Sequence, residues 1–157
     1  MSGRVLAGGL VLFALIFGAA LWWFQTRGYY VETVNETVTV AGVVIPVTNY
    51  QGIDADTSPL KLRSCFTADP IDGPAPERPD PLIPPGWFDC FNAEGIATDL
   101  ASGDARAILA ESNVPYGFDR IIAQYPDGRA YQWRQINNCG KASFDGDPLP
   151  AGCPEKE

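Results

Sequence analysis

The chain has 157 residues, 46% of them apolar, with 14 prolines and 16 glycines. This length predicts one folded domain with a short additional segment rather than two domains. All 19 acidic residues but only nine of the eleven basic residues follow position 28, so that part carries a net charge of −10. Such a charge repels phosphate backbones and attracts basic partners, and nucleic acid is therefore excluded as an expected partner.

The first predicted element is an apolar segment from Val5 to Phe24, twenty residues without a charge. As an α-helix it would be about 30 Å long, which is enough to cross a bilayer core. A cleaved signal peptide is the alternative, but it requires small residues at the cleavage site, where this sequence has Leu21-Trp22-Trp23-Phe24. We therefore expect a transmembrane anchor at residues 1–27 and a folded domain at residues 28–157.

Aromatic residues gather where the apolar segment ends, which is typical of the belt at a lipid–water boundary. The expected belt, in contact with membrane lipid, comprises Trp22, Trp23, Tyr29 and Tyr30. Positive charge is slightly greater before the apolar segment than after it. The α-amino group and Arg4 precede the segment, whereas Arg27 follows it and is offset by Glu32. This bias predicts a protein of a bacterial inner membrane, with the N-terminus in the cytoplasm and the domain in the periplasm.

Small residues recur at helical spacing along one side of the apolar segment. This stripe, in which only the third residue is larger, comprises Gly3, Ala7, Val11, Ala14 and Gly18. Small residues at four-residue spacing let a second helix approach closely, so the stripe is a candidate helix-packing face. The alternative is that glycine and alanine are simply common in membrane spans.

The four cysteines, Cys65, Cys90, Cys139 and Cys153, all follow the apolar segment. The sequence has no Cys-x-x-Cys pair and no histidine, so we expect no zinc, haem or other metal site. Of the three possible connectivities we favour Cys65 with Cys90 and Cys139 with Cys153, because nearest pairs close short loops around turn-rich stretches. Four unpaired thiols are the alternative, and they would require a reducing compartment.

Residues 31–48 are rich in valine and threonine and predict a hairpin of two short strands, broken at Ala41-Gly42. Turn residues at 49–52 and 54–56 predict a connection. Residues 60–66 alternate as in a half-buried strand. Seven prolines between positions 69 and 85 predict an extended loop, either a rigid connector or a recognition surface.

Two short helices are expected next, at residues 93–101 and 105–112, with Asn92 and Asp104 as N-caps. An Asp127-Gly128 pair between two β-type runs predicts a hairpin over residues 118–136. Residues 140–157 are expected to form a loose tail. The fold class is therefore α+β, with short antiparallel strands and one or two helices on one face.

No catalytic residues are expected. The sequence has no Gly-x-Ser-x-Gly elbow, no phosphate-binding glycine loop and no histidine to act as a general base. Two Asp-x-Asp pairs, at 54–56 and 145–147, raise the possibility of calcium, but neither completes a calcium-loop pattern and surface acids are the better interpretation. We therefore expect no enzymatic activity and no cofactor.

Three segments carry a resemblance: residues 60–66 (LKLRSCF), residues 86–91 (GWFDCF) and residues 125–135 (YPDGRAYQWRQ). Together with the glycine- and alanine-rich span, they resemble a small alphaproteobacterial inner-membrane family of unknown function. Some of its members carry the name histidine kinase. This chain has no histidine to accept a phosphoryl group, and the resemblance implies no activity or site residues.

Two main functions are open. The first is a non-catalytic accessory or assembly subunit that docks on a larger inner-membrane complex, such as a respiratory or photosynthetic electron-transfer complex. Its acidic domain would then concentrate a basic c-type cytochrome. The second is a ligand-binding or sensor module, whose expected binding surface comprises Trp87, Phe88, Tyr131, Trp133 and Arg134. These aromatics fit a core as well as a pocket. A thiol oxidoreductase would instead require a labile, exposed disulfide.

Overall fold

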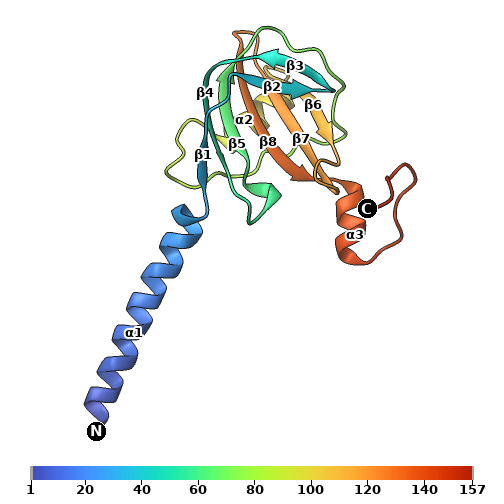
Figure 1. Ribbon diagram of the computed structural model, residues 1–157. Helices are drawn as coiled ribbons and strands as arrows, with labels where there is room; N and C mark the ends of the chain where they lie inside the picture. Colours follow the sequence, from blue (N-terminus) through green and yellow to red (C-terminus); the bar gives the residue numbers. More distant parts are fainter. Residues whose placement is uncertain (1, 157) are drawn as a thin grey trace. The chain divides into compact units, whose positions relative to one another are not determined.

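The computed structural model describes residues 2–156 and divides the chain into two compact units, with the boundary between Tyr30 and Val31. The first unit is one helical segment, in which α1 (Gly3–Trp23) continues as a π-helical turn, η1 (Phe24–Gly28) (Figure 1). None of the residues of these two helices is buried within the chain. The segment is long and apolar enough to cross a membrane, as expected.

The second unit is built on a six-stranded antiparallel sheet with the strand order β1-β4-β5-β8-β7-β6. Its strands are β1 (Val31–Thr33), β4 (Thr48–Asp54), β5 (Arg63–Thr67), β6 (Arg106–Ser112), β7 (Phe118–Gln124) and β8 (Arg129–Ile136). A separate antiparallel hairpin consists of β2 (Thr37–Val40) and β3 (Val43–Pro46). The α+β fold class is confirmed.

Both faces of the central sheet are covered (Figure 1). On one face the β2–β3 hairpin buries an apolar cluster that includes Val40, Phe66 and Ile122. On the other face α2 (Ala93–Ser102) packs on a second cluster, around Trp133 and Ile121. Strand β5, one of the two central strands of this covered sheet, is therefore buried over residues 63–66, and the expectation of a half-buried strand is wrong.

The β6 edge of the sheet is protected by main-chain hydrogen bonds from two other segments. The Ala41 amide of the β2–β3 turn donates to the Ala110 carbonyl at 2.8 Å, and the Leu109 amide donates to the Pro74 carbonyl at 2.7 Å. The proline-rich stretch, residues 69–85, contains neither helix nor strand. One part of it thus occupies a strand edge that would otherwise be open to another chain.

Several local expectations are confirmed. The Asp127-Gly128 turn joins β7 to β8, with Gly128 at φ 90°. Ala41 and Gly42 adopt positive φ angles of 48° and 81° in the β2–β3 turn. The side chain of Asn92 caps α2 by accepting a hydrogen bond from the Gly95 amide at 3.1 Å.

The predicted helix at residues 105–112 is wrong, because these residues form β6. Ile108 and Ala110 are buried toward the hairpin, whereas Ala107 and Leu109 pack toward α2. This alternation with a period of two outweighs the high helix propensity of alanine.

The predicted turn at residues 49–52 is also wrong, because it lies inside β4. Asn49 adopts φ 53°, and the strand register shifts between Thr48 and Gln51. The turn-type residues therefore mark a bulge within a strand.

Two further helices lie where the sequence predicted none. A short 3-10 turn, η2 (Pro59–Lys61), precedes β5. Helix α3 (Asn138–Asp145) occupies the beginning of the segment that was expected to be a loose tail. The Asn137 side chain caps α3 by accepting a hydrogen bond from the Gly140 amide at 2.9 Å.

Candidate functional site

The five residues of the expected binding surface lie in three different places. Trp133 is fully buried, and Tyr131 lies beside it in the cluster under α2, where the ring of Phe91 packs edge-on against both. These two side chains thus belong to the core. Trp87 and Phe88 belong to the loop before α2, with ring centroids 6.3 Å apart.

Arg134, the fifth residue, is bound in an ion pair on the face of the sheet opposite Trp133. Its guanidinium lies 2.9 Å from a carboxylate oxygen of Asp54. Phe88 also packs against the cluster around Trp133, and of the predicted set only Trp87 and Phe88 line a pocket.

These two aromatics line a pocket at the β1–β4 edge of the sheet, which we call the edge pocket. Its cavity volume is about 330 Å³, and its walls come from residues 32–34, 50–53 and 87–90. That volume is within the range of about 300 to 1,000 Å³ that is usual for small-molecule sites. The sequence pointed to Trp87 and Phe88, but not to β1 and β4, because pairing between distant strands has no local signal.

The edge pocket carries negative charge. Its lining includes the carboxylates of Glu32 and Asp89 and no lysine or arginine. Among residues 2–156, neither of these side chains has a hydrogen bond or an ion pair. The nearest positive strand residue, Arg63, pairs with Ile53 in register and donates to the carbonyls of Leu60, Leu62 and Leu82.

A second polar feature lies on the hairpin-facing side of the sheet, and we call it the polar row. It comprises Thr33, Ser64, Gln132, Arg120 and Arg134, each with one buried nitrogen or oxygen that has no hydrogen-bond partner in the described chain. The residues are neighbours in register, since Ser64 lies opposite Gln132 and Arg120 lies opposite Arg134. Five such atoms on one face of the sheet make part of the interior beneath the hairpin polar.

The charges of the polar row are balanced. Arg120 lies 2.8 Å from Glu111 and donates to the Thr39 carbonyl at 2.9 Å, and Arg134 is paired with Asp54. Burial lowers the pKa of Arg120, and the neighbouring Arg134 lowers it further, while Glu111 opposes both. Two arginines facing two carboxylates leave no net charge for an external ion.

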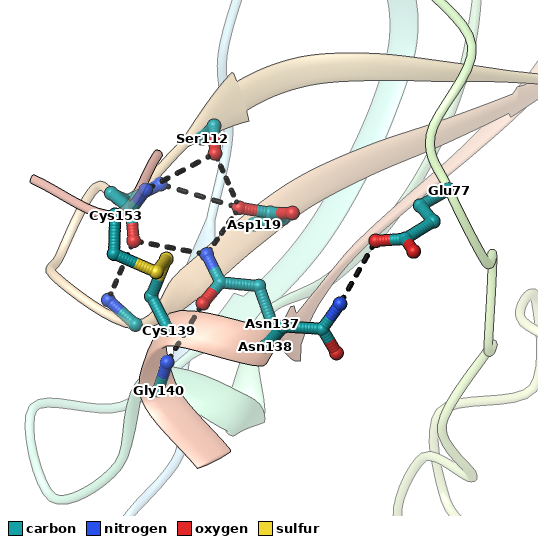
Figure 2. Close-up of a disulfide and its surroundings, with 10 residues drawn as sticks. Glu77, Ser112, Asp119, Asn137, Asn138, Cys139, Gly140 and Cys153 are labelled. Carbon is teal, nitrogen blue, oxygen red and sulfur yellow. Dashed lines mark hydrogen bonds between the residues drawn. A yellow bond between two sulfur atoms is a disulfide. The ribbon is translucent and has the colours of Figure 1, made fainter. Parts of the chain in front are cut away.

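A hydrogen-bond network ties the β6–β7 connection to α3 beside the Cys139–Cys153 disulfide (Figure 2). One carboxylate oxygen of Asp119 accepts from the Ser112 hydroxyl at 2.8 Å, the Asn113 amide at 3.3 Å and the Asn137 side chain at 2.7 Å. Asn137 also caps α3. The network positions a helix end, which is a structural role.

A larger groove, of about 540 Å³, runs between the proline-rich loop and the end of β8. Its lining mixes acids such as Glu77 and Asp80 with the cations Arg78 and Lys141. Gln135 closes it by accepting from the Asp80 amide and donating to the Arg78 carbonyl, and Asn138 donates to Glu77 (Figure 2). Opposite charges and existing hydrogen bonds give this groove no single ligand chemistry.

The disulfide pairing expected from sequence is confirmed. Cys65 is bonded to Cys90 and Cys139 to Cys153, which uses all four cysteines. Residues 2–156 contain no group of three or more metal-ligating side chains. Of the aspartates considered for calcium, Asp54 is engaged with Arg134.

In the first unit, the expected helix-packing stripe and three of the four expected belt aromatics are exposed, the fourth, Tyr30, being half-buried. In the same helix the rings of Phe13 and Phe17 stack on each other, with centroids 5.8 Å apart. The small-residue side of α1 is thus left uncovered by the chain itself.

Comparison with known proteins places this fold in a family. Residues 31–154 match the model of a family of unknown function (DUF6446), and the chain belongs to that family. The match begins at the first residue of β1 and includes every strand of the sheet domain and both of its α-helices. No curated protein and no solved structure matches the chain.

Proposed function

We propose that this protein is a non-catalytic, membrane-anchored accessory or assembly subunit of a larger inner-membrane complex. The observation that carries the proposal is α1, an apolar helix of 21 residues with no buried residue. Its stripe of small residues offers a second helix a close approach. The domain that follows is acidic and stapled by two disulfides, which suits an oxidising compartment.

In this proposal the N-terminus is cytoplasmic and the domain is periplasmic, in an inner membrane of the alphaproteobacterial type. A respiratory or photosynthetic electron-transfer complex is the host that we propose. The net charge of −10 would raise the local concentration of a basic c-type cytochrome. If so, cytochrome affinity falls as ionic strength rises, and it falls when the domain is deleted.

The docking proposal is tested by adding bulk to α1. Ala7→Leu and Ala14→Leu enlarge the small-residue stripe, whereas Gly9→Leu and Ala20→Leu enlarge the opposite side of the helix. We expect the first pair, and not the second, to release the protein from a larger complex on native gels of membranes solubilised in mild detergent. Equal effects of the two pairs would contradict docking through this stripe.

The edge pocket favours a second candidate function, a ligand-binding module. It has a small-molecule volume and two aromatic walls, and its two carboxylates have no partner among residues 2–156. A ligand-binding domain and a docking helix are compatible in one chain, and each is tested separately.

A further inference from the structure

We propose that the edge pocket binds an organic ammonium group, as carried by choline, betaines and the headgroups of ethanolamine or choline lipids. The inference deepens the ligand-binding candidate and does not depend on docking through α1. Its basis is the combination of aromatic walls and acidic rim in one cavity of ligand size.

Charge selects a cation. Glu32 and Asp89 both line the pocket without a partner in the described chain, and the lining holds no basic side chain. The whole domain carries a net charge of −10, which adds a long-range attraction for cations. An anion would have to approach two carboxylates, whereas a cation is attracted by both.

The remaining lining favours an organic cation over a metal ion. Two carboxylates are too few for a protein-built metal site, and the sulfur of Cys90 is bound to Cys65. Trp87 and Phe88 provide aromatic surface, and the exposed side chain of Val34 provides an apolar one. Quaternary and primary ammonium groups bind to such surfaces through the negative faces of the rings.

The pocket wall is preorganised. The Cys65–Cys90 disulfide fixes one end of the aromatic segment to β5, and the Phe88 amide donates to the Pro85 carbonyl at 2.9 Å. Ile53, in β4, is fully buried and fixes the opposite wall. Little ordering is therefore required when a ligand enters.

The test titrates choline into the full-length protein in a maltoside micelle, observed by saturation-transfer NMR. We expect binding on the order of millimolar, which two or three cation–aromatic and ionic contacts can supply. The neutral isostere 3,3-dimethylbutanol has the same shape without the charge, and we expect it not to bind. Absence of choline binding, or equal binding of the isostere, would overturn the proposal.

Variants locate the site. The double variant Glu32→Gln, Asp89→Asn and the single variant Trp87→Leu should each weaken choline binding about fivefold. The matched control Glu155→Gln neutralises an exposed acid in the C-terminal tail and should change nothing. Thermal unfolding checks that each variant is folded, and unchanged affinity in both folded pocket variants would overturn the assignment.

An experiment in nanodiscs distinguishes a lipid headgroup from a free molecule as the source of the ammonium group. If a lipid headgroup is the occupant, nanodiscs of phosphatidylglycerol with phosphatidylcholine weaken the apparent affinity for free choline relative to nanodiscs of the same phosphatidylglycerol content with a neutral glycolipid, which have the same surface charge. If a free molecule is the occupant, the two affinities agree. Failure of docking in the native-gel experiment changes neither result, so the two proposals fail independently.

Discussion

Tyr125 joins the β7–β8 turn to α2 by a single side-chain hydrogen bond. Its hydroxyl donates to Asp99 at 2.6 Å, and its ring packs edge-on against Tyr131. Burial raises the pKa of Tyr125 above its ordinary value of 10.0, and the hydrogen bond to the Asp99 carboxylate raises it further. The protonated phenol is thus part of the folded structure.

This coupling predicts a loss of stability at alkaline pH. Below pH 10 the phenol of Tyr125 is protonated in both the folded and the unfolded state, and its contribution to the free energy of unfolding is fully present. As the pH rises above 10, the unfolded chain ionises first, so the free energy of unfolding falls. In urea unfolding between pH 8 and pH 11, Tyr125→Phe should show a smaller alkaline decrease than the wild type; an equal or larger decrease would contradict the raised pKa.

At the residue scale the sequence identified aromatic candidates without separating core from surface. Both Trp87 and Trp133 are large aromatics in the sequence, yet Trp133 lies on a central strand under α2 and Trp87 on a loop. Strand order decides the burial of each, and it depends on contacts between distant residues. Glu32 and Asp89 of the edge pocket had no local signal either, because the pocket is formed by segments that are distant in the sequence.

Among the elements, the β2–β3 hairpin is held to the sheet partly by Arg120. The guanidinium pairs with Glu111 and donates to the Thr39 carbonyl in β2. An arginine in β7 thereby bridges an adjacent strand and the covering hairpin.

Replacing Arg120 with methionine should therefore loosen the hairpin. The variant keeps apolar bulk but leaves Glu111 unpaired and Thr39 without its donor, which should cost about 2 kcal/mol. Hydrogen exchange should accelerate in β2 and β3 more than in β5 or β8. As a control, Arg129→Met breaks an exposed pair in the β7–β8 turn and should change stability little. Unchanged exchange in the hairpin would contradict the bridging role.

The second disulfide bonds Cys139 of helix α3 to Cys153 in the C-terminal segment. In the loop-entropy account, removing Cys139–Cys153 with Cys139→Ser and Cys153→Ser costs about 3 kcal/mol. We expect faster hydrogen exchange in α3, while the Asn137 cap retains part of the helix. Chemical unfolding measures the loss; full protection of α3 in the double variant would show that the cap alone is sufficient.

The elements were predictable where a local signal was strong. The Asp-Gly hairpin and the Asn92-capped helix have short-range causes, and both are confirmed. Residues 105–112 were mistaken for a helix because alanine favours helices, whereas pairing with β7 determines their structure. The bulge at Asn49 likewise requires a neighbouring strand.

At the scale of the whole molecule, an apolar helix precedes an acidic, disulfide-bonded domain. The proposed topology predicts that alkaline phosphatase fused after Glu157 is active in intact cells, because that enzyme requires an oxidising compartment. A reporter that is active only in the cytoplasm should be silent at the same position. The reverse pattern would contradict a periplasmic domain.

The central claim is that this chain is a subunit of a larger membrane complex. The most direct measurement is affinity purification of the tagged full-length protein from native membranes in mild detergent, with quantitative mass spectrometry of the proteins that copurify. The account predicts one defined integral-membrane complex in near-stoichiometric amount. Recovery of the protein alone would contradict the accessory-subunit proposal and leave the ligand-binding module as its function.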